Sequence, residues 1–199
     1  DAPIMNQIAD EIIDEDSSLI ISVSATDADG DEPTYSAEAG DDAVASIDGS
    51  SITITPIGDY NGDMLVTITA TDESDSFGST DFTLSVLPVN DAPVINAIEE
   101  QTTNEDELFT IDLSANDLDG DDLSFSASVD NNAIANVEGT LLTVQPDENY
   151  SNDIGGPIEV TAVVSDGILS TETTFTLNVL NLNDAPIMNQ IADEIIDED

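Results

Sequence analysis

The sequence predicts an all-β fold, with two tandem, seven-stranded Greek-key β-sandwich domains stacked end to end. Three observations lead to this fold class. The sequence repeats itself along its length, apolar residues alternate with polar ones over short segments, and clusters of Gly, Asp, Asn and Pro separate those segments. Alternation with a period of two is typical of half-buried strands, and such clusters are typical of turns.

The repeats define the domain boundaries. Residues 1–16, DAPIMNQIADEIIDED, recur without change at 184–199, and a related copy, DAPVINAIEEQTTNED, begins at Asp91. A chain of 199 residues is long enough for two ordinary domains. We therefore predict one domain over 1–90, a second over 91–183, and the first strand of a third over 184–199.

Each repeat contains seven segments with strand character. In the first repeat they are residues 4–8, 19–25, 34–38, 43–47, 51–55, 64–71 and 82–86. Seven antiparallel strands in about 90 residues are typical of an immunoglobulin-type sandwich. The chain has no Cys and no Trp, so the narrower antibody pattern is not implied.

The large side chains are assigned to the core or to loop packing. They are Met64, three Tyr and five Phe, of which only Phe77 and Phe109 fall outside the core pattern. Tyr60 and Tyr150 come just before the sixth strand of their repeats, where a hydrogen bond like that of a tyrosine corner is expected.

The charge balance is extreme, with 45 Asp and Glu and no Lys, Arg or His. Two carboxylates about 4 Å apart near a surface repel by roughly 4 kcal/mol, so a carboxylate cluster here needs an external cation. Without basic residues, nucleic-acid binding and attraction to an anionic membrane are excluded. The sequence has no apolar run long enough to span a membrane, and its lack of Cys excludes disulfides. We expect a monomer.

The acidic residues sort onto the two ends of each sandwich, because successive strands alternate in direction. The loops after the first and fifth strands and the outgoing linker share one end; the loops after the second and sixth share the other. The first group contains Glu15, Asp59, Asn90 and Asp91, with Glu105, Asn183 and Asp184 in the second repeat. The second group contains Asp27, Asp29, Asp31 and Asp72, with Asp117, Asp119, Asp121 and Asp166 as counterparts.

Stacked domains would bring the first group of one repeat to the second group of the next. The set predicted at this junction is Glu15, Asp59, Asn90, Asp91, Asp117, Asp119, Asp121 and Asp166. Hard oxygen ligands in flexible loops suit Ca²⁺, which takes six to eight of them, whereas zinc favours His or Cys. We predict Ca²⁺ as the cofactor, bridging neighbouring repeats of the same chain.

Several motifs resemble those of cadherin-type repeats: NED at 104–106, TDAD at 26–29, NDLD at 116–119, ATD at 70–72, VSD at 164–166 and LPVNDAP at 87–93. Their combination, over both full units, resembles the cadherin-like tandem repeats of giant RTX-type bacterial adhesins secreted by type I systems. The resemblance implies an extracellular, calcium-rigidified extender on the bacterial cell surface, which projects a distal adhesive domain for adhesion or biofilm formation.

The sequence departs from the cadherin pattern in the linker, where Pro88 and Ala92 replace an Asp and an Asn. The acidic motif after the fifth strand is reduced to Asp59 in the first repeat and shifted to 146–149 in the second. We therefore expect one or two calcium ions at each junction rather than the three that the resemblance implies.

Other interpretations compete with this one. An Asp-x-Asp-Gly-Asp loop alone is more often a turn than a metal site, and general acidity could be a halophilic surface. A calcium-dependent carbohydrate-binding or homophilic adhesion module, with surface glycans as partners, is the main alternative function. A glycosidase would need a carboxylic acid kept protonated in an apolar pocket, whereas the carboxylates here lie in open, charged loops. We expect no enzyme activity.

Overall fold

The computed structural model describes residues 1–183, 185, 186 and 188, and the chain forms two compact units, Asp1–Val89 and Asn90–Asp199. Within the described residues all regular structure is β except for one short helix, α1 (Asn152–Gly155). The all-β prediction of two tandem domains is confirmed. Most of the predicted third repeat, including the predicted site residue Asp184, lies outside the described residues.

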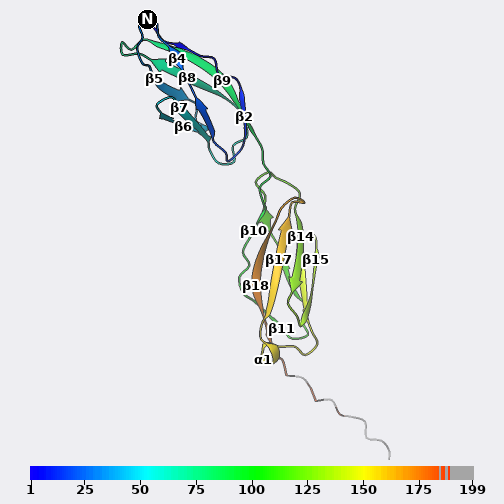
Figure 1. Cartoon of the computed structure of the whole chain (residues 1–199). Coiled ribbons are helices and arrows are strands. Elements are labelled where there is room, and N and C mark those ends of the chain that lie inside the picture. The colour runs from blue at the N-terminus through cyan, green and yellow to red at the C-terminus, as the bar shows by residue number, and fades with distance from the viewer. Residues whose placement is uncertain (184, 187, 189–199) are drawn as a thin grey trace, which may run out of the picture. The chain divides into compact units, whose positions relative to one another are not determined.

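The first unit is a sandwich of two main sheets (Figure 1). One has the order β2-β9-β8-β5, in which β2 runs parallel to β9; the other has the order β3-β7-β6. A short pair, β1-β4, extends one end. The strands are β1 (Ile4–Met5), β2 (Glu11–Asp14), β3 (Leu19–Ser22), β4 (Ala25–Thr26), β5 (Thr34–Glu38), β6 (Ala43–Asp48), β7 (Ser51–Pro56), β8 (Gly62–Thr71) and β9 (Phe77–Leu87).

The second unit repeats this topology, with sheets β11-β18-β17-β14 and β12-β16-β15 and the pair β10-β13. Strand β11 runs parallel to β18, as β2 does to β9. The strands are β10 (Val94–Ile95), β11 (Gln101–Asn104), β12 (Phe109–Asp112), β13 (Ala115–Asn116), β14 (Ser124–Val129), β15 (Ala133–Glu138), β16 (Leu141–Pro146), β17 (Ile158–Ser165) and β18 (Ser170–Leu180).

Each unit has its own core between its two main sheets. Alternate residues of the central strands point inward, and the fully buried ones include Ile52, Ile54, Val66, Ile68 and Leu84 in the first unit, and Leu142, Val144, Val160, Val164 and Leu177 in the second. Burial of this apolar surface is the main stabilising term, at about 25 cal/mol per Å². The core fixes the strand ends, and the strand ends position the acidic loops.

Three predicted strands differ clearly from those of the structure. Of the segment predicted at 4–8, only β1 is a strand, and β2 follows outside the predicted range, because the chain leaves β4 and pairs with β9 in another sheet. The segment predicted at 19–25 is β3 and β4, because its first part pairs with β7 and its last part with β1. The seventh strand is longer than predicted, since its polar Ser and Thr residues pair with β8 as far as Phe77.

The predictions for burial of the large side chains need one correction, at Phe109. Met64 is buried and Phe77 is 66% exposed, as expected, but Phe109 is buried in the second core. It lies on β12 opposite Val144, and its ring centroid is 6.2 Å from that of Phe175.

The tyrosine-corner prediction is wrong. The hydroxyl of Tyr60 donates to the carbonyl of Asp63 at 3.3 Å, and that of Tyr150 donates to the carbonyl of Gly156 at 2.8 Å. Both acceptors lie downstream, whereas a tyrosine corner bonds to the backbone upstream. The tyrosines instead close the loops that lead into β8 and β17.

Candidate metal centre

Within a single unit, the described residues contain one close group of carboxylates that could hold a metal ion. It lies in the loop between β13 and β14. Asp117, Asp119 and Asp121 each offer a carboxylate oxygen there, and these oxygens lie within 4.8 Å of one another. Gly120 adopts a φ of 78°, a left-handed conformation that suits Gly and turns the chain. The backbone N–H of Asp121 donates to Oδ1 of Asp117 at 3.1 Å, which draws the two ends of the loop together.

Asp117 also has an oxygen without a protein partner. Its Oδ2 is buried and accepts no hydrogen bond, and Oδ2 of Asp27, the matching residue of the first unit, is in the same state. A buried acceptor without a partner costs about 1–3 kcal/mol, and more when it is charged. The equivalent atom is therefore left unsatisfied by the protein in both units.

Two further segments bring predicted residues to this loop. The backbone N–H of Asp91 donates to Oδ2 of Asp119 at 2.8 Å, and Nδ2 of Asn90 donates to Oδ2 of Asp166 at 2.9 Å. Oδ1 of Asp166 accepts the N–H groups of Ile168 and Leu169, both at 2.6 Å. Six predicted residues, Asn90, Asp91, Asp117, Asp119, Asp121 and Asp166, thus belong to one connected end of the second unit.

Two carboxylates at this end have pKa values shifted in opposite directions. Desolvation raises the pKa of Asp121, and repulsion from the nearby carboxylates, Asp117 first, raises it further. The hydrogen bond from Asn90 lowers the pKa of Asp166, although desolvation partly opposes it, and the backbone N–H groups lower it too. Asp166 is thus a stabilised anion, whereas Asp121 carries a charge that its surroundings disfavour.

The matching end of the first unit is arranged differently. The N–H of Asp29 donates to Oδ1 of Asp27 at 2.7 Å. This hydrogen bond spans two residues, whereas the one between Asp121 and Asp117 in the second unit spans four. Asp72 is buried and its Oδ1 accepts the N–H groups of Ser74 and Ser76 at 2.8 and 2.9 Å. Among the described residues, Asp31 does not join Asp27 and Asp29 in a group as tight as the one at 117–121.

The opposite end of each unit holds a buried glutamate. Glu15 and Glu105 are each 5% exposed. Oε1 of Glu15 accepts the N–H of Val89 at 2.5 Å and its Oε2 accepts Nδ2 of Asn61 at 3.3 Å, while Oε1 of Glu105 accepts the N–H of Leu182 at 2.5 Å. Each glutamate therefore fixes the segment that follows the last strand of its own unit, a structural role that the sequence did not predict.

Two aspartates were missed beside these glutamates. Oδ1 of Asp16 accepts the N–H of Asp59 at 3.3 Å, and Oδ1 of Asp106 accepts the N–H of Asn149 at 2.9 Å. All four of these residues have φ between 57 and 60°. The second-unit counterpart of predicted Asp59 is thus Asn149, with the same backbone role but no charge. The repeated Glu-Asp pair was the signal that could have identified Asp16 and Asp106.

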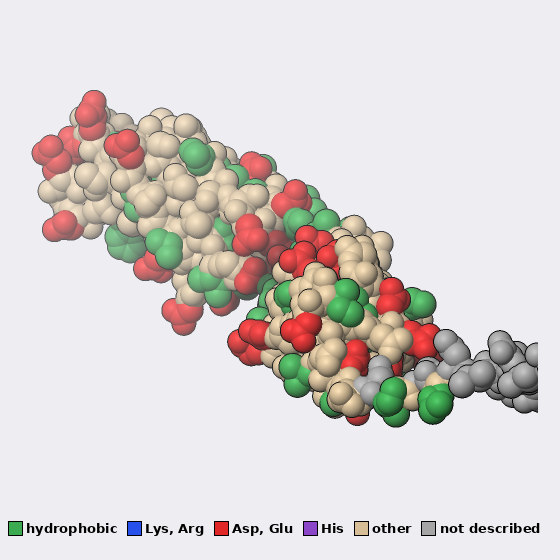
Figure 2. Space-filling view, turned by 90° about the horizontal axis from the view of Figure 1, so that it is seen from below, with side chains coloured by type: hydrophobic (Ala, Val, Ile, Leu, Met, Phe, Trp, Pro, Cys, Tyr) green, Lys and Arg blue, Asp and Glu red, His purple; other side chains and the backbone are tan. Residues whose placement is uncertain are grey.

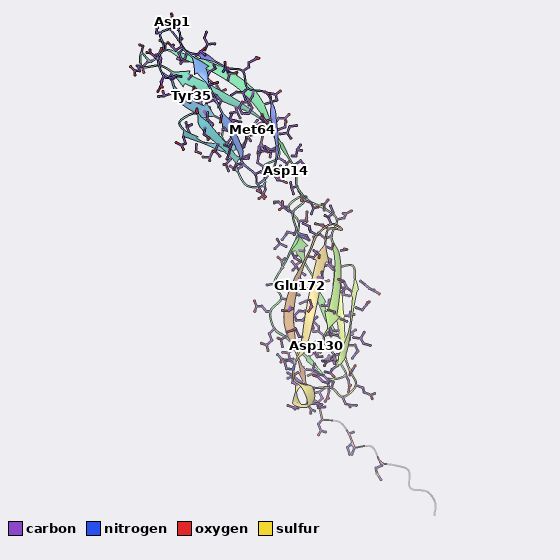
Figure 3. All side chains as sticks on the ribbon, viewed as in Figure 1. Asp1, Asp14, Tyr35, Met64, Asp130 and Glu172 are labelled. Carbon is purple, nitrogen blue, oxygen red and sulfur yellow. The ribbon has the colours of Figure 1, made fainter. Side chains whose placement is uncertain are left out.

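Predicted Asn183 lies just past β18, within the part of the chain that the structure describes. The ends of the units are easy to follow in Figure 3, where Asp1 and Asp14 mark opposite ends of the first unit. On the face drawn in Figure 2 every charged side chain is acidic. The donor set is therefore carboxylate, amide and carbonyl oxygen, which suits a hard cation.

Comparison with known proteins identifies the family. Residues 1–85 and 90–180 each match the family described as Bacterial Ig domain. The chain belongs to the bacterial Ig domain family. No curated protein matches the sequence.

Solved structures show where else this bacterial Ig fold occurs. Drosophila N-cadherin EC1-4 is 20% identical with a TM-score of 0.51, and the match covers 91% of this chain and 50% of that one. The cadherin domains 3-6 of protocadherin gamma B2 are 18% identical with a TM-score of 0.51, over 94% and 49% of the two chains. Human protocadherin-24 EC1-2 is 14% identical with a TM-score of 0.51, over 92% and 99%.

This bacterial Ig pair spans about half the length of the first two of those cadherin structures. It spans 29% of an endo-fucoidan hydrolase from glycoside hydrolase family 107, at 17% identity and a TM-score of 0.39. The three cadherin likenesses support the cadherin-like sandwich fold. In the described residues no helix is long and apolar enough to cross a membrane.

Proposed function

We propose that this chain is a calcium-binding extender segment of a bacterial cell-surface adhesin. The observation that carries the proposal is the buried, unpartnered Oδ2 of Asp117, which lies in a group of three carboxylates in a chain without a single basic side chain. A metal cation is the partner that such an oxygen lacks.

Calcium fits the donor set better than other common metals. Asp117, Asp119 and Asp121 would supply carboxylate oxygens, and Asp166 and the side-chain carbonyl of Asn90 lie on the segments beside them. Ca²⁺ accepts six to eight oxygens in flexible geometry, whereas Mg²⁺ requires a near-ideal octahedron and retains water. When bound, the ion supplies positive charge that offsets the repulsion among these carboxylates.

The extender role rests on the tandem organisation. Repeated units that each carry the same loops, with a short linker at 90–93, are typical of arrays whose function is length and stiffness. That Glu15 and Asp59 complete a metal site together with the second unit stays a prediction. The extracellular location, the type I export and the adhesive role belong to this proposal as well.

Calcium titration of the full chain tests the metal site. Extracellular modules bind Ca²⁺ with Kd on the order of 10⁻⁴–10⁻³ M, so calorimetry should detect saturable binding in the millimolar range. The melting temperature should rise when calcium is added and should fall back to its calcium-free value when a chelator removes the ion. Sodium at matched ionic strength and magnesium are the controls; if sodium alone gives the whole shift, general screening explains the effect and the site is refuted.

Small-angle scattering of the two-unit chain tests the extender role separately. We expect a narrow distribution of shapes in calcium and a broader one in chelator, since carboxylates near the linker would repel one another when no bound cation offsets their charge. Binding of calcium without any narrowing would leave the metal site standing and refute the extender role.

Carbohydrate binding is the second candidate, favoured by one observation. Of the aromatic side chains, all of which lie in the described residues, only Phe77 is exposed. A single exposed ring is a small platform for a sugar. If Phe77→Ala abolished retention on an immobilised polysaccharide that the wild-type chain binds, this candidate would replace the extender. We propose no catalytic role for the chain.

A further inference from the structure

The open side of the first sandwich, between β5 and β6, has features of a docking site for an extended peptide. Both strands are edges: β5 ends the sheet β2-β9-β8-β5, and β6 ends the sheet β3-β7-β6. Figure 1 shows the two strands on the same side of the unit. An edge strand presents unpaired backbone N–H and C=O groups, and proteins usually protect it with Lys, Pro or a bulge. Strand β6 has no Lys and no Pro.

The hairpin fixes which backbone groups of β6 are unpaired. Asp48 lies opposite Ser51 across a two-residue turn, and a closing pair of this kind exchanges its hydrogen bonds. Alternation then directs the backbone groups of Ala43, Ala45 and Ile47 away from β7. Pro56, which lacks an N–H, lies opposite Ala43, in agreement with this assignment.

Two hollows lie beside this edge. One, of about 570 Å³, is lined by Pro33, Tyr35 and Ile47 among others. The other, of about 370 Å³, is lined mostly by small residues, including Ala37, Ala39, Ala43 and Ala45. Recognition by strand addition uses backbone hydrogen bonds for affinity and pockets for alternate side chains for specificity, and the first unit presents both along one edge.

The charge around the edge selects the partner. Glu32, Glu38, Asp41, Asp42 and Asp48 are all exposed at or next to these strands. A second copy of this chain would bring the same carboxylates and would be repelled. We propose that the β6 edge of the first unit binds, by strand addition, an extended segment of another protein in which apolar side chains alternate with Lys or Arg.

The second unit supplies a matched control. Its edge strand β15 has the same pattern, with Ala135 in the place of Ala45. Val129 replaces Ala39, and Asn131 and Asn132 replace Asp41 and Asp42, so this edge has a bulkier side chain and fewer charges. We expect the two edges to differ in peptide binding although their backbones are alike.

The probe is a fluorescent heptapeptide in which Lys and Val alternate, titrated by anisotropy into the full chain at fixed calcium. A peptide of the same composition with its Lys and Val in separate blocks is the control. Ala45→Pro removes an outward N–H and not a ladder bond, so it should weaken binding about tenfold, as expected for one lost hydrogen bond plus poorer fit. Ala135→Pro should change the affinity by less than about twofold.

A second variant protects the test against misfolding. Ala45→Leu keeps the N–H and fills the smaller hollow; it too should weaken binding while the melting temperature is retained. Equal binding of both peptides, or an unchanged affinity in Ala45→Pro and Ala45→Leu, would overturn the proposal. Self-association that Ala45→Pro abolishes, seen by sedimentation without peptide, would assign the edge to a second copy and overturn the proposed partner. None of these outcomes depends on whether calcium binds at Asp117.

Discussion

The two ends of each unit hold their carboxylates in different ways. At one end, Oδ2 of Asp27 and of Asp117 is buried without a partner. At the other end, the side chains of Glu15 and Glu105 are buried, and backbone N–H groups of Val89 and Leu182 donate to them. Both ends are acidic, and they differ in whether each buried oxygen has a hydrogen-bond partner.

This difference separates two roles for an acidic side chain. A buried carboxylate that accepts N–H donors is stabilised as an anion and holds the fold together without metal. A carboxylate with an unpartnered buried oxygen costs free energy until a cation arrives. The glutamates should therefore matter most in chelator, and the aspartates should matter most in calcium.

The largest expected effect on stability is the loss of the hydrogen bond between Glu15 and the N–H of Val89, which we call the glutamate clamp. Glu15→Ala removes the acceptor of the Val89 N–H and leaves that group unpaired, so it should cost about 1–3 kcal/mol of unfolding free energy. The measurement is chemical denaturation in chelator, where a metal ligand would have no role. Glu105→Ala should behave alike, because it frees the N–H of Leu182.

The matched control for Glu15 is Asp14, which is exposed at the end of β2. Asp14→Ala removes the same charge without breaking the clamp, so its stability should change by less than about 0.5 kcal/mol. If Glu15→Ala were neutral in chelator and harmful only in calcium, Glu15 would be a ligand rather than a clamp, and the contrast between the two ends would disappear.

The next effect concerns Asp117. Calcium at ten times its Kd stabilises a folded site by about 1.4 kcal/mol through mass action. Asp117→Asn should remove most of that gain from the second unit and cost nothing in chelator, because one charge leaves a group of carboxylates within 4.8 Å of each other. Calorimetric melting with and without calcium measures both quantities.

Asp27→Asn sharpens the same comparison between equivalent loops. Asp27 has the same unpartnered oxygen, but among the described residues it belongs to no group of carboxylates as tight as that of Asp117. Its variant should therefore reduce the calcium response less than Asp117→Asn does. An equal or larger loss at Asp27 would show that the unpartnered oxygen, and not the gathered group, determines affinity.

Much of the fold could be predicted because local patterns of apolar and turn-forming residues determine where strands begin and end. Strand β5 was placed correctly from Thr34 to Glu38, and strand direction alone placed Asn90 and Asp91 with the loops of Asp166 and Asp119, to which they are hydrogen-bonded. The sheet switch between β1 and β2 was missed because pairing partners are distant in sequence. Phe109 was misplaced because its burial depends on Phe175, on the opposite sheet.

The site was predicted as a set of residues but not as a set of roles. The types of residue at Glu15 and Asp117 are similar, and a sequence cannot show which of them keeps a buried oxygen without a hydrogen-bond partner. Asp16 and Asp106 were missed because their function is to accept backbone donors at 59 and 149, which no ligand motif describes.

A smaller effect is expected at Asp119. Its Oδ2 accepts the N–H of Asp91, and an Asn at this position can still accept that bond through its carbonyl oxygen. Asp119→Asn should therefore leave stability in chelator within about 0.5 kcal/mol and weaken calcium binding at this end. An unchanged calcium titration would remove Asp119 from the metal site.

The smallest expected effect is a pH dependence at Asp121. Its pKa is raised in the folded chain, by desolvation first and then by repulsion from Asp117 and its neighbours. The folded state therefore binds this proton more tightly than the unfolded state does. The resulting stabilisation is fully present below the unfolded pKa of about 4 and is lost as pH rises through the higher folded value. In chelator, the stability of wild type relative to Asp121→Asn should fall as pH rises from about 4 towards 7.

The control for Asp121 lies one residue away. Asp122→Asn removes an equal charge from an exposed position in the same loop, so a general effect of net charge would appear in both variants. Asp166, whose pKa is lowered, contributes in the opposite sense: its stabilisation is present above its unfolded pKa and is lost as pH falls through its folded value. Calcium should invert the Asp121 difference near neutral pH, because the charge that the metal-free loop disfavours becomes a ligand. A stability difference that is independent of pH in chelator would show that Asp121 is not under this repulsion. A stability difference that calcium leaves unchanged would show that Asp121 is not a ligand of the ion.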